Sequence, residues 1–410
     1  MANAVDTIRP VQPGSNYGPD QCPACGAGPL EVFYEVDNVP TNSCILLSSE
    51  EEARAYPTGD IRLAFCPSCG FVHNAAFDLA KTEYSGRYEE TQGYSGTFNT
   101  FHKGLAERLI KKHELRGKDV LEIGCGKGEF LLLLSQLGDN RGVGIDPGVD
   151  PDRLTGEAAE RLTFIKDFYS KKYDDRPFDF VACKMTLEHI PAAERFMRDV
   201  REGIGANTDT VVFFQIPEAL RILKFCAFED IYYEHCSYFS PGSLARLFRR
   251  AGFEVLNIEI EYGEQYLTIE AKPARAPAPA LPPLPIEDDL DVLRDLVRTF
   301  PARNAEVLGK WRKSIADLNA QGRTAVVWGS GSKAVSFITA LGDPKAIRYV
   351  IDINPHRHGH YMPHSAQRIV APAELKEIKP DDVIVMNRIY LDEIRNDLSD
   401  MGLSPNIMAL

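Results

Sequence analysis

The stretch Val120-Leu121-Glu122-Ile123-Gly124-Cys125-Gly126-Lys127-Gly128 decides the fold, because an apolar strand here runs directly into a glycine-rich turn. A backbone that passes close to a bound molecule has no room for Cβ atoms, and the three glycines remove them. The next strand ends in Asp146, about twenty residues beyond the glycines, as in dinucleotide-binding folds. A carboxylate at that position can accept hydrogen bonds from the two hydroxyls of a ribose. The pattern therefore predicts a nucleotide pocket.

The spacing of the glycines distinguishes between two kinds of cofactor. Gly-x-Gly-x-Gly after Leu-Glu-Ile resembles the first motif of the class I S-adenosylmethionine (SAM) methyltransferases more closely than the Gly-x-Gly-x-x-Gly of NAD enzymes. The resemblance implies a SAM site formed by Glu122, Gly124, Gly126, Gly128 and Asp146. A tight turn that binds nothing would carry the same glycines. The amphipathic stretch that follows and the acidic strand end favour cofactor binding.

Apolar strands alternate with amphipathic helices between residues 100 and 272, which predicts a doubly wound α/β sheet. A segment rich in Pro and Ala follows, and we interpret it as a stiff linker, since proline supplies no hydrogen-bond donor to a sheet. The strands of the sheet are expected at Asp119–Ile123, Arg141–Asp146, Phe178–Cys183, Thr210–Ile216, Phe253–Ile260 and Tyr266–Ala271.

A second strand-glycine-helix unit, Ala325–Lys333, lies beyond a long helical stretch expected from about Glu287 to Ala320. Later strands are expected at Tyr349–Ile353 and Val383–Met386. These elements predict a second, smaller Rossmann-like domain. The glycine turn is a weak indication of a second nucleotide site, because we identify no acidic strand end at the usual distance.

Two Cys-Pro-x-Cys-Gly knuckles occur within the first 80 residues. Each puts two thiolates on one tight turn, and two such pairs make a tetrahedral zinc site. A redox function is the alternative, but two identical copies without thioredoxin-like surroundings favour metal. Because protein fills all four positions, the zinc is expected to be structural. The predicted ligands are Cys22, Cys25, Cys66 and Cys69.

Length and composition restrict the function further. The 410 residues exceed one ordinary core, and 44% hydrophobic with 26% charged residues is typical of a soluble globular protein. A net charge of −13 without a dense Lys/Arg stripe argues against a nucleic-acid partner. No segment approaches about eighteen consecutive apolar residues, and Met1–Asp6 lacks the regions of a signal peptide. We therefore expect a cytoplasmic protein without a membrane partner, whose oligomeric state stays open.

The series of motifs resembles the nucleotide-sugar C-methyltransferases of deoxysugar biosynthesis. Its most specific pieces are Tyr232-Tyr233-Glu234-His235-Cys236-Ser237-Tyr238-Phe239-Ser240 and Asp352-Ile353-Asn354-Pro355-His356-Arg357-His358-Gly359. The resemblance covers nearly the whole chain. It implies a zinc-binding module at residues 1–80, a SAM-dependent methyltransferase domain at 81–272, a Pro-rich linker at 273–290 and the Rossmann-like domain at 291–410.

In that family a 4-keto sugar linked to a nucleoside diphosphate loses a proton beside its carbonyl, and the enolate attacks the methyl group of SAM. The resemblance implies that His235 is the base. A proton α to a ketone is acidic enough for imidazole if the enolate oxygen is stabilised. Tyr232 could donate that hydrogen bond, and Glu234 could orient a ring nearby. The alternative is that these aromatic residues form core and His235 is a satisfied histidine at a helix entry.

Further site residues follow from the same resemblance. His189 comes after the fourth core strand and matches a histidine at the active-site edge, as a substrate contact or as the cap of the next helix. Asp167 ends the third strand and would reach the adenine amino group, although a carboxylate there is also a common helix cap. Tyr88 and Tyr94 occupy the place of the family's Tyr/Ser-rich lid, and the sequence does not decide which of them lines the pocket.

The chain departs from the family around the sugar. It carries Tyr232-Tyr233-Glu234-His235 where Tyr-His-Glu-His is common, and Gly263-Glu264-Gln265-Tyr266 where the family has a Gly-Gly-Ser segment. Arg357 and Lys333 could hold a diphosphate or support domain packing. Two alternatives to a keto-sugar C-methyltransferase therefore stay open. One is a SAM-dependent O- or N-methyltransferase of another small acceptor, and the other is a zinc-containing scaffold that binds ligands without chemistry.

Overall fold

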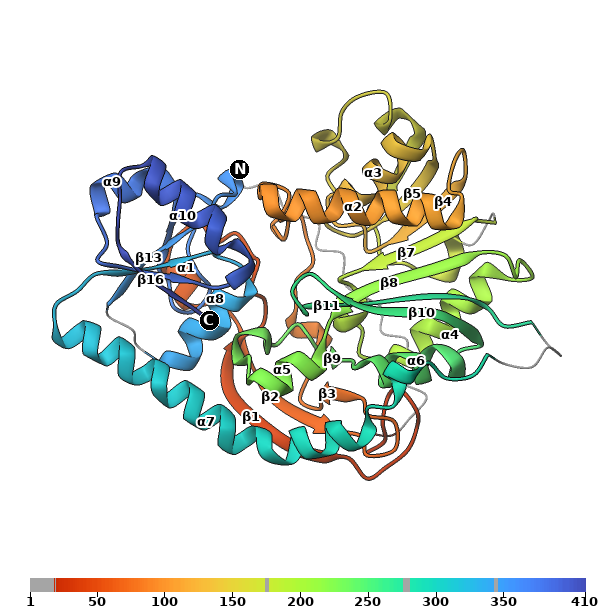
Figure 1. Ribbon diagram of the computed structural model, residues 1–410, viewed down its shortest axis with the longest axis horizontal. Helices are drawn as coiled ribbons and strands as arrows, with labels where there is room; N and C mark the ends of the chain where they lie inside the picture. The colour runs from red at the N-terminus through yellow and green to blue at the C-terminus, as the bar shows by residue number, and fades with distance from the viewer. Residues whose placement is uncertain (1–17, 19, 174–176, 276–280, 343–345) are drawn as a thin grey trace.

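The computed structural model describes residues 18, 20–173, 177–275, 281–342 and 346–410, which form three β-sheets with their covering helices (Figure 1). Met1–Asp6 and residues 276–280 of the Pro-rich segment lie outside the described residues.

The central sheet has seven strands in the order β10-β11-β8-β7-β4-β5-β6. The strands from β8 to β6 run parallel, whereas β11 pairs antiparallel with both β8 and β10. This sheet confirms the predicted doubly wound fold. The chain winds outward from β4 in both directions, so ligands are expected at the carboxyl ends of β4 and β7. The bounds are β4 Asp119–Ile123, β5 Arg141–Ile145, β6 Leu162–Ile165, β7 Phe180–Lys184, β8 Val211–Pro217, β10 Phe253–Glu261 and β11 Tyr266–Pro273.

Helices cover both faces of the central sheet (Figure 1). On one face, α2 (Gly96–His113) and α3 (Glu129–Gly138) pack apolar side chains against β4, β7 and β8. On the other face, α4 (Ala193–Ile204) and α6 (Pro241–Arg250) bury a second apolar cluster. Both faces of the sheet are therefore buried, as parallel sheets require.

The N-terminal part forms a four-stranded antiparallel sheet with one strand from a distant segment. β1 (Glu31–Pro40), β2 (Thr58–Phe65) and β3 (Val72–Asn74) come first in the chain, with α1 (Glu50–Arg54) between β1 and β2. The fourth strand, β9 (Ser237–Tyr238), pairs with β3. The segment that carries Tyr232–Cys236 is thus anchored to the N-terminal sheet as well as to the central one.

The C-terminal domain is a parallel five-stranded sheet in the order β14-β13-β12-β15-β16, which confirms the predicted Rossmann-like unit. Its two edge strands, β14 (Arg368–Val370) and β16 (Asn406–Ala409), were not predicted from the sequence. The other elements of the domain are β12 Ala325–Trp328, α8 Ser332–Leu341, β13 Ile347–Ile351, α9 Leu375–Ile378, β15 Asp382–Val385 and α10 Leu391–Asp400.

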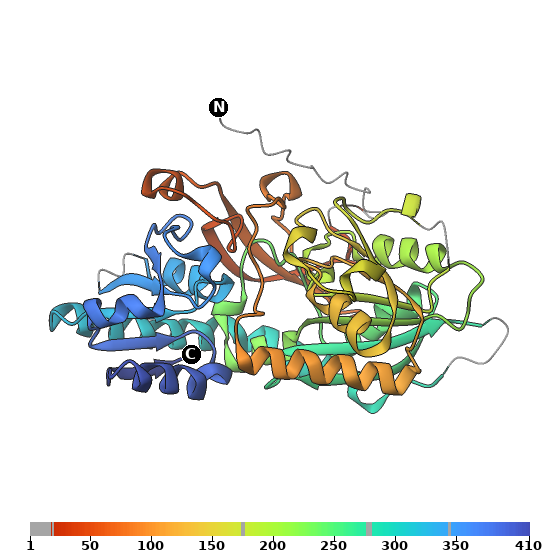
Figure 2. The same cartoon turned by 90° about the horizontal axis from the view of Figure 1, so that it is seen from above.

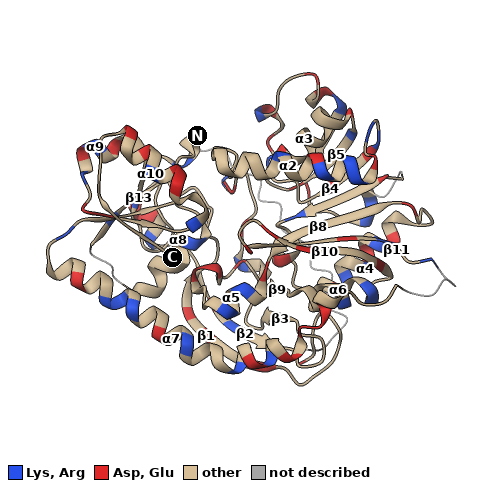
Figure 3. Ribbon diagram, in the orientation of Figure 1, with Lys and Arg blue, Asp and Glu red and all other residues tan. Residues whose placement is uncertain are grey.

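The long helix α7 (Leu290–Ala320) connects the C-terminal domain with the N-terminal sheet (Figures 1 and 2). Its outer face mixes both signs of charge (Figure 3), as in the ion pair between Lys313 and Asp317 at 2.7 Å. Its inner face places Phe300 edge-on to Phe33 and Tyr34 of β1. Within the described ranges, no helix combines the length and the apolar character that a membrane span needs.

Candidate active site

A cavity of about 920 Å³ lies at the carboxyl ends of β4, β5 and β7, where the C-terminal domain and the segment 79–95 also border it. This volume is at the upper end of the range for ligand pockets. The cavity brings together most of the residues predicted from the sequence. Its lining includes Tyr88, Tyr94, Glu122, Gly124, Gly126, Asp146, Asp167, His189, Tyr232 and His235, whereas Gly128 and Glu234 lie behind it.

Two positions in the turn after β4 require glycine, because their φ angles are positive and neighbouring side chains leave no room for a Cβ atom. Gly124 has φ +67°, and a Cβ there would lie 2.0 Å from Oγ1 of Thr186. Gly128 has φ +82°, and its Cβ would lie 2.7 Å from Leu154 and from Phe164. Protein therefore fills the space next to these two glycines that was expected to hold a cofactor. The turn still exposes Gly124–Gly126 to the cavity.

Asp146, which follows β5, is held by the glycine turn itself. Its two carboxylate oxygens accept hydrogen bonds from the backbone N–H groups of Gly126 at 3.0 Å and Gly148 at 2.7 Å. Burial raises the pKa of Asp146, and these two hydrogen bonds oppose the shift. Each oxygen keeps a lone pair, so the carboxylate can accept the hydroxyls of a ribose from the cavity.

A buried acid and a half-buried base lie on neighbouring strands of the cavity wall. Glu122 pairs in register with Ala182, so Lys184 is its diagonal neighbour on the same face of the sheet. Nζ of Lys184 lies 2.6 Å from Nε2 of His102 and 4.0 Å above the ring of Phe130. Burial raises the pKa of Glu122 to about 8 and lowers the pKa of Lys184 to about 8. Lys184 was not predicted as a site residue. A lysine at the end of the apolar strand Phe180–Lys184 was the feature of the sequence that could have indicated it.

The buried His235 lies beside a second histidine, His189, which is half-buried. His235 is 4% exposed, and its Nε2 lies 2.9 Å from the hydroxyl of Tyr232. Its ring stands edge-on to that of His189 at 4.8 Å, and Nδ1 of His189 lies 3.0 Å from the hydroxyl of Tyr84. Burial lowers the pKa of His235 well below its usual value and that of His189 to about 4. Both rings are therefore neutral near pH 7 and can accept a proton.

Glu234 points away from this histidine pair and binds the N-terminal part instead. Its carboxylate accepts hydrogen bonds from Nδ2 of Asn42 at 3.0 Å, the backbone N–H of Ser43 at 3.1 Å and the hydroxyl of Tyr88 at 3.0 Å. The hydroxyl of Ser43 adds a fourth hydrogen bond. The ring that Glu234 orients is thus that of Tyr88. Asn42 and Ser43 did not stand out in the sequence.

The two lid tyrosines differ in position. Tyr88 reaches inward to Glu234, whereas Tyr94 is 45% exposed and its ring lies 6.2 Å from that of His356. Both border the cavity, and Tyr88 is the one fixed within the site. Asp167 also borders the cavity, where it accepts hydrogen bonds from Tyr173 and Lys172, both at 2.5 Å. The hydrogen bond from Lys172 lowers its pKa.

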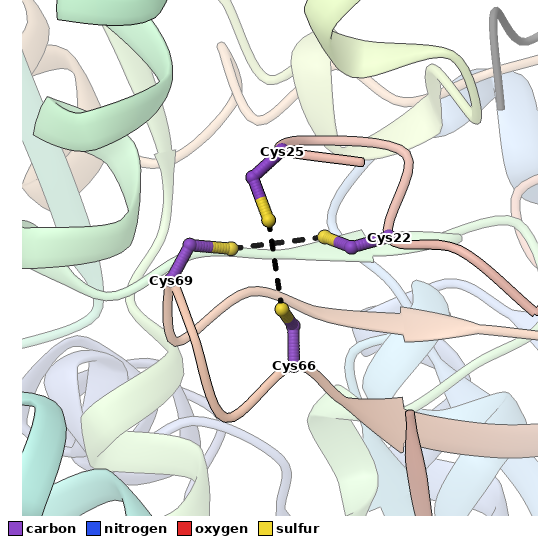
Figure 4. Close-up of side chains that lie close together, drawn as sticks. All are labelled: Cys22, Cys25, Cys66 and Cys69. Carbon is purple, nitrogen blue, oxygen red and sulfur yellow. Dashed lines mark hydrogen bonds between the residues drawn. The ribbon is translucent and has the colours of Figure 1, made fainter. Parts of the chain in front are cut away.

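The four cysteines of the two knuckles meet with their sulfur atoms facing one another (Figure 4). The sulfurs of Cys22 and Cys69 are 3.7 Å apart, and those of Cys25 and Cys66 are 3.6 Å apart. Zinc with Zn–S bonds of about 2.3 Å in a tetrahedron requires sulfur separations of about 3.8 Å. The arrangement therefore fits a zinc ion with four thiolate ligands.

The C-terminal glycine turn does have an acidic partner, so the prediction from the sequence was wrong on this point. Asp352 accepts hydrogen bonds from the backbone N–H of Ser330 at 2.8 Å and from its hydroxyl at 2.5 Å. We expected a strand through residue 353, but β13 ends at Ile351 and leaves Asp352 at the strand end. Both Asp352 and the glycine turn border the cavity.

Arg357 supports domain packing. Its guanidinium is buried and donates to the carbonyl oxygen of Ser330 at 2.9 Å and to that of Glu89. Lys333 forms an ion pair with Asp230 and borders the cavity. Arg357 also borders the cavity, so its hydrogen bonds show domain packing and leave the diphosphate contact a prediction.

Comparison with protein families defines the class. A methyltransferase domain matches residues 98–258, and a C-methyltransferase C-terminal domain matches residues 286–403. The two matches identify a SAM-dependent methyltransferase whose C-terminal domain is similar to that of C-methyltransferases. The protein is therefore an enzyme, and the alternative of a scaffold without chemistry is set aside.

Individual relatives agree with this class. The chain is 24% identical to the C-methyltransferase NovU of Streptomyces niveus over 414 residues, which cover 95% of this chain and 92% of that protein. It is 28% identical over 187 residues to a ubiquinone biosynthesis O-methyltransferase of Neisseria meningitidis serogroup C, covering 39% of this chain and 75% of the relative.

A solved structure with similarity to the chain is that of the 1,6-didemethyltoxoflavin-N1-methyltransferase of Burkholderia thailandensis, with bound 1,6-didemethyltoxoflavin and S-adenosylhomocysteine. It is 18% identical, with a TM-score of 0.36, and covers 45% of this chain and 83% of that one.

Proposed function

We propose that the enzyme methylates a carbon next to the keto group of a nucleotide-linked deoxysugar, with His235 as the base. The observation that carries the proposal is the neutral, buried imidazole of His235 on the cavity wall, with the hydroxyl of Tyr232 at 2.9 Å. A neutral imidazole beside a hydroxyl donor is the pair that enolisation of a ketone needs.

The SAM site is proposed at the carboxyl end of β4 and β5. Asp146 is placed for the ribose hydroxyls, and Asp167 borders the same cavity for the adenine amino group. Glu122 and Lys184, acid and base side by side, complement the amine and carboxylate of an amino-acid tail. When bound, SAM supplies an electrophilic methyl group.

The residues on the other side of the cavity act on the acceptor. The hydroxyl of Tyr232 and Nε2 of His235 share a hydrogen bond at 2.9 Å in this structure. When a keto oxygen enters, we expect the hydroxyl to donate to that oxygen instead, which frees Nε2 to accept the proton from the adjacent carbon. His189 stands edge-on to His235 and limits the rotation of its ring. Burial of the His235 ring keeps water away from the forming enolate.

We also propose that Cys22, Cys25, Cys66 and Cys69 bind structural zinc. The geometry of the four sulfurs supports it, and protein ligands fill every position, so the metal takes no part in the reaction. None of the nine cysteines, all of which lie among the described residues, forms a disulfide, and we propose a cytoplasmic location.

The test is carbon-bound deuterium uptake by a thymidine diphosphate 4-keto-6-deoxysugar in heavy water, followed by mass spectrometry with and without SAM. Wild-type enzyme should catalyse exchange, and added SAM should give a gain of one methylene. The His235→Ala variant should do neither while it still binds SAM. The exposed His364, as His364→Asn, serves as the matched control and should behave as the wild type. Exchange that persists in His235→Ala would refute His235 as the base, and a methyl gain without exchange would favour an oxygen or nitrogen acceptor.

A further inference from the structure

Glu188 is a buried carboxylate that the mechanism above does not use. It lies in the short helical turn Leu187–His189 that follows β7, it is 1% exposed, and it borders the cavity. Neither of its carboxylate oxygens has a hydrogen-bond partner among the described residues. Glu234, in contrast, accepts hydrogen bonds from Asn42, Ser43 and Tyr88. A buried carboxylate without partners is costly, so its position calls for a function.

The proposed base is a close polar neighbour of this carboxylate. Oε1 of Glu188 lies 4.0 Å from Nε2 of His235. Ligand-type atoms of Glu188, His189 and His235 all lie within 4.8 Å of one another. Other titratable or charged groups around this cluster include Tyr84, Cys183, Tyr232, Cys236, Tyr238, Tyr266 and Lys333.

The reaction creates a proton that the closed site has to hold. Burial, the neighbouring His189 and Lys333 keep the pKa of His235 low, so its imidazole takes a proton but retains it poorly. Burial has the opposite effect on the carboxyl group and raises the pKa of Glu188 to about 8. Because burial destabilises a charged imidazolium as well as a lone carboxylate, a proton shared between the two groups neutralises the pair.

We propose that Glu188 is the positioning and proton-storing partner of His235, an inference that rests on the enolate mechanism proposed above. The C–H bond of the substrate breaks, its electron pair stays on carbon as the enolate, and the proton moves to Nε2 of His235. Rotation of the Glu188 side chain closes the 4.0 Å gap, and the proton passes from Nε2 of His235 to the carboxylate. The new C–C bond forms as the S–CH₃ bond breaks. Glu188 then releases the proton to solvent once the site opens, so that one proton leaves per turnover.

A divalent metal held by the same three side chains is a different use of this cluster. Such an ion would have to displace the hydrogen bond between Tyr84 and His189, at 3.0 Å, and that between Tyr232 and His235, at 2.9 Å. Proton storage uses the groups as they stand. Metal analysis of the wild type and of a Glu188 variant distinguishes the two uses.

The test is the pH profile of deuterium exchange into the keto sugar nucleotide, from pH 5 to 10, for wild type, Glu188→Gln and Glu188→Asp. Glu188 takes the proton only when ionised, so the wild-type rate should rise with pH through about 8. Glu188→Gln should lose this rise and exchange about 100-fold more slowly at pH 8. Its Kd for SAM should stay unchanged. Glu188→Asp should recover part of the rate together with the rise.

The matched control is Glu270→Gln, which removes a buried carboxylate on β11 that binds Lys112 and His113 away from the cavity. It should lower the melting temperature and leave the shape of the pH profile unchanged. A wild-type rate and profile in Glu188→Gln would overturn the inference. So would metal analysis that finds, besides the zinc of the four cysteines, a second ion that Glu188→Gln loses. His235→Ala separates the two proposals. If this variant still exchanges deuterium, the enolate mechanism with His235 as the base fails. If His235→Ala is inactive while Glu188→Gln behaves as the wild type, only the role of Glu188 fails.

Discussion

Replacement of Glu234 by Gln should weaken the contact between the segment that carries Tyr232–Cys236 and the N-terminal part of the chain. Oε1 of Glu234 accepts from the backbone N–H and the hydroxyl of Ser43, while Oε2 accepts from Asn42 and Tyr88. A glutamine amide offers only one oxygen, so its NH₂ group would face two donors. Asn42 cannot turn over without loss, because its Oδ1 already accepts from Tyr56 and from the backbone N–H of Glu83.

The expected cost follows from the hydrogen bonds lost. Hydrogen bonds to a charged group contribute about 1.5–3 kcal/mol each. The substitution removes the negative charge that all four hydrogen bonds share, and it leaves at least one buried donor unpaired. We therefore expect local stability to fall by about 3 kcal/mol. At about 1.4 kcal/mol per tenfold change, local opening around Ser43 should become about 100-fold more frequent.

Hydrogen exchange read at the backbone amide of Ser43 measures this opening directly, since that N–H donates to Glu234. The exchange rate should rise about 100-fold in Glu234→Gln at a pH and temperature where exchange follows the opening equilibrium. Glu52→Gln is the matched control, because Glu52 also accepts a backbone N–H in this part of the chain but is partly exposed. Wild-type protection of Ser43 in Glu234→Gln would refute the reasoning.

Three further substitutions test separate parts of the molecule. Gly124→Ala forces a Cβ to within 2.0 Å of Thr186 at φ +67°, which should weaken SAM binding at least about tenfold by calorimetry, and an unchanged Kd would contradict the role of the turn. Cys69→Ser should lose the zinc in elemental analysis and lower the melting temperature, whereas a full zinc content would argue against the four-thiolate site. Arg357→Met removes the hydrogen bonds to Ser330 and Glu89, so limited proteolysis should cut the chain faster between the domains, and an unchanged digestion pattern would show that Arg357 does not join them.

The main elements could be predicted from the sequence because each carries its own local signal. β4 and β10 begin at the predicted residues, since an apolar strand next to a glycine turn or a hairpin has distinct ends. The two Cys-Pro-x-Cys-Gly turns are equally distinct in the sequence. The short edge strands β14 and β16 carry no such signal, because three or four residues are too few to show periodicity.

The cavity contacts could not be predicted in the same way, because they join residues far apart in the chain. Glu234 lies 191 positions from Ser43, with which it forms its hydrogen bonds. The unpartnered state of Glu188 is a property of the folded cavity and leaves no trace in Leu187-Glu188-His189. An error of two residues in the end of β13 was enough to hide Asp352. The class of enzyme was therefore easier to predict than the contacts around its cavity.

Both α/β domains contain the same local arrangement. An aspartate that follows one strand, β5 or β13, accepts a hydrogen bond from the backbone of the glycine turn that follows the neighbouring strand, β4 or β12. Asp146 accepts from the N–H of Gly126 at 3.0 Å, and Asp352 accepts from that of Ser330 at 2.8 Å. The two arrangements border one cavity of about 920 Å³. The carboxyl edge of such a sheet is where nucleotides bind. A cavity with two such edges suits a donor and an acceptor that each carry a nucleoside, which supports a nucleotide-linked acceptor over a smaller free one.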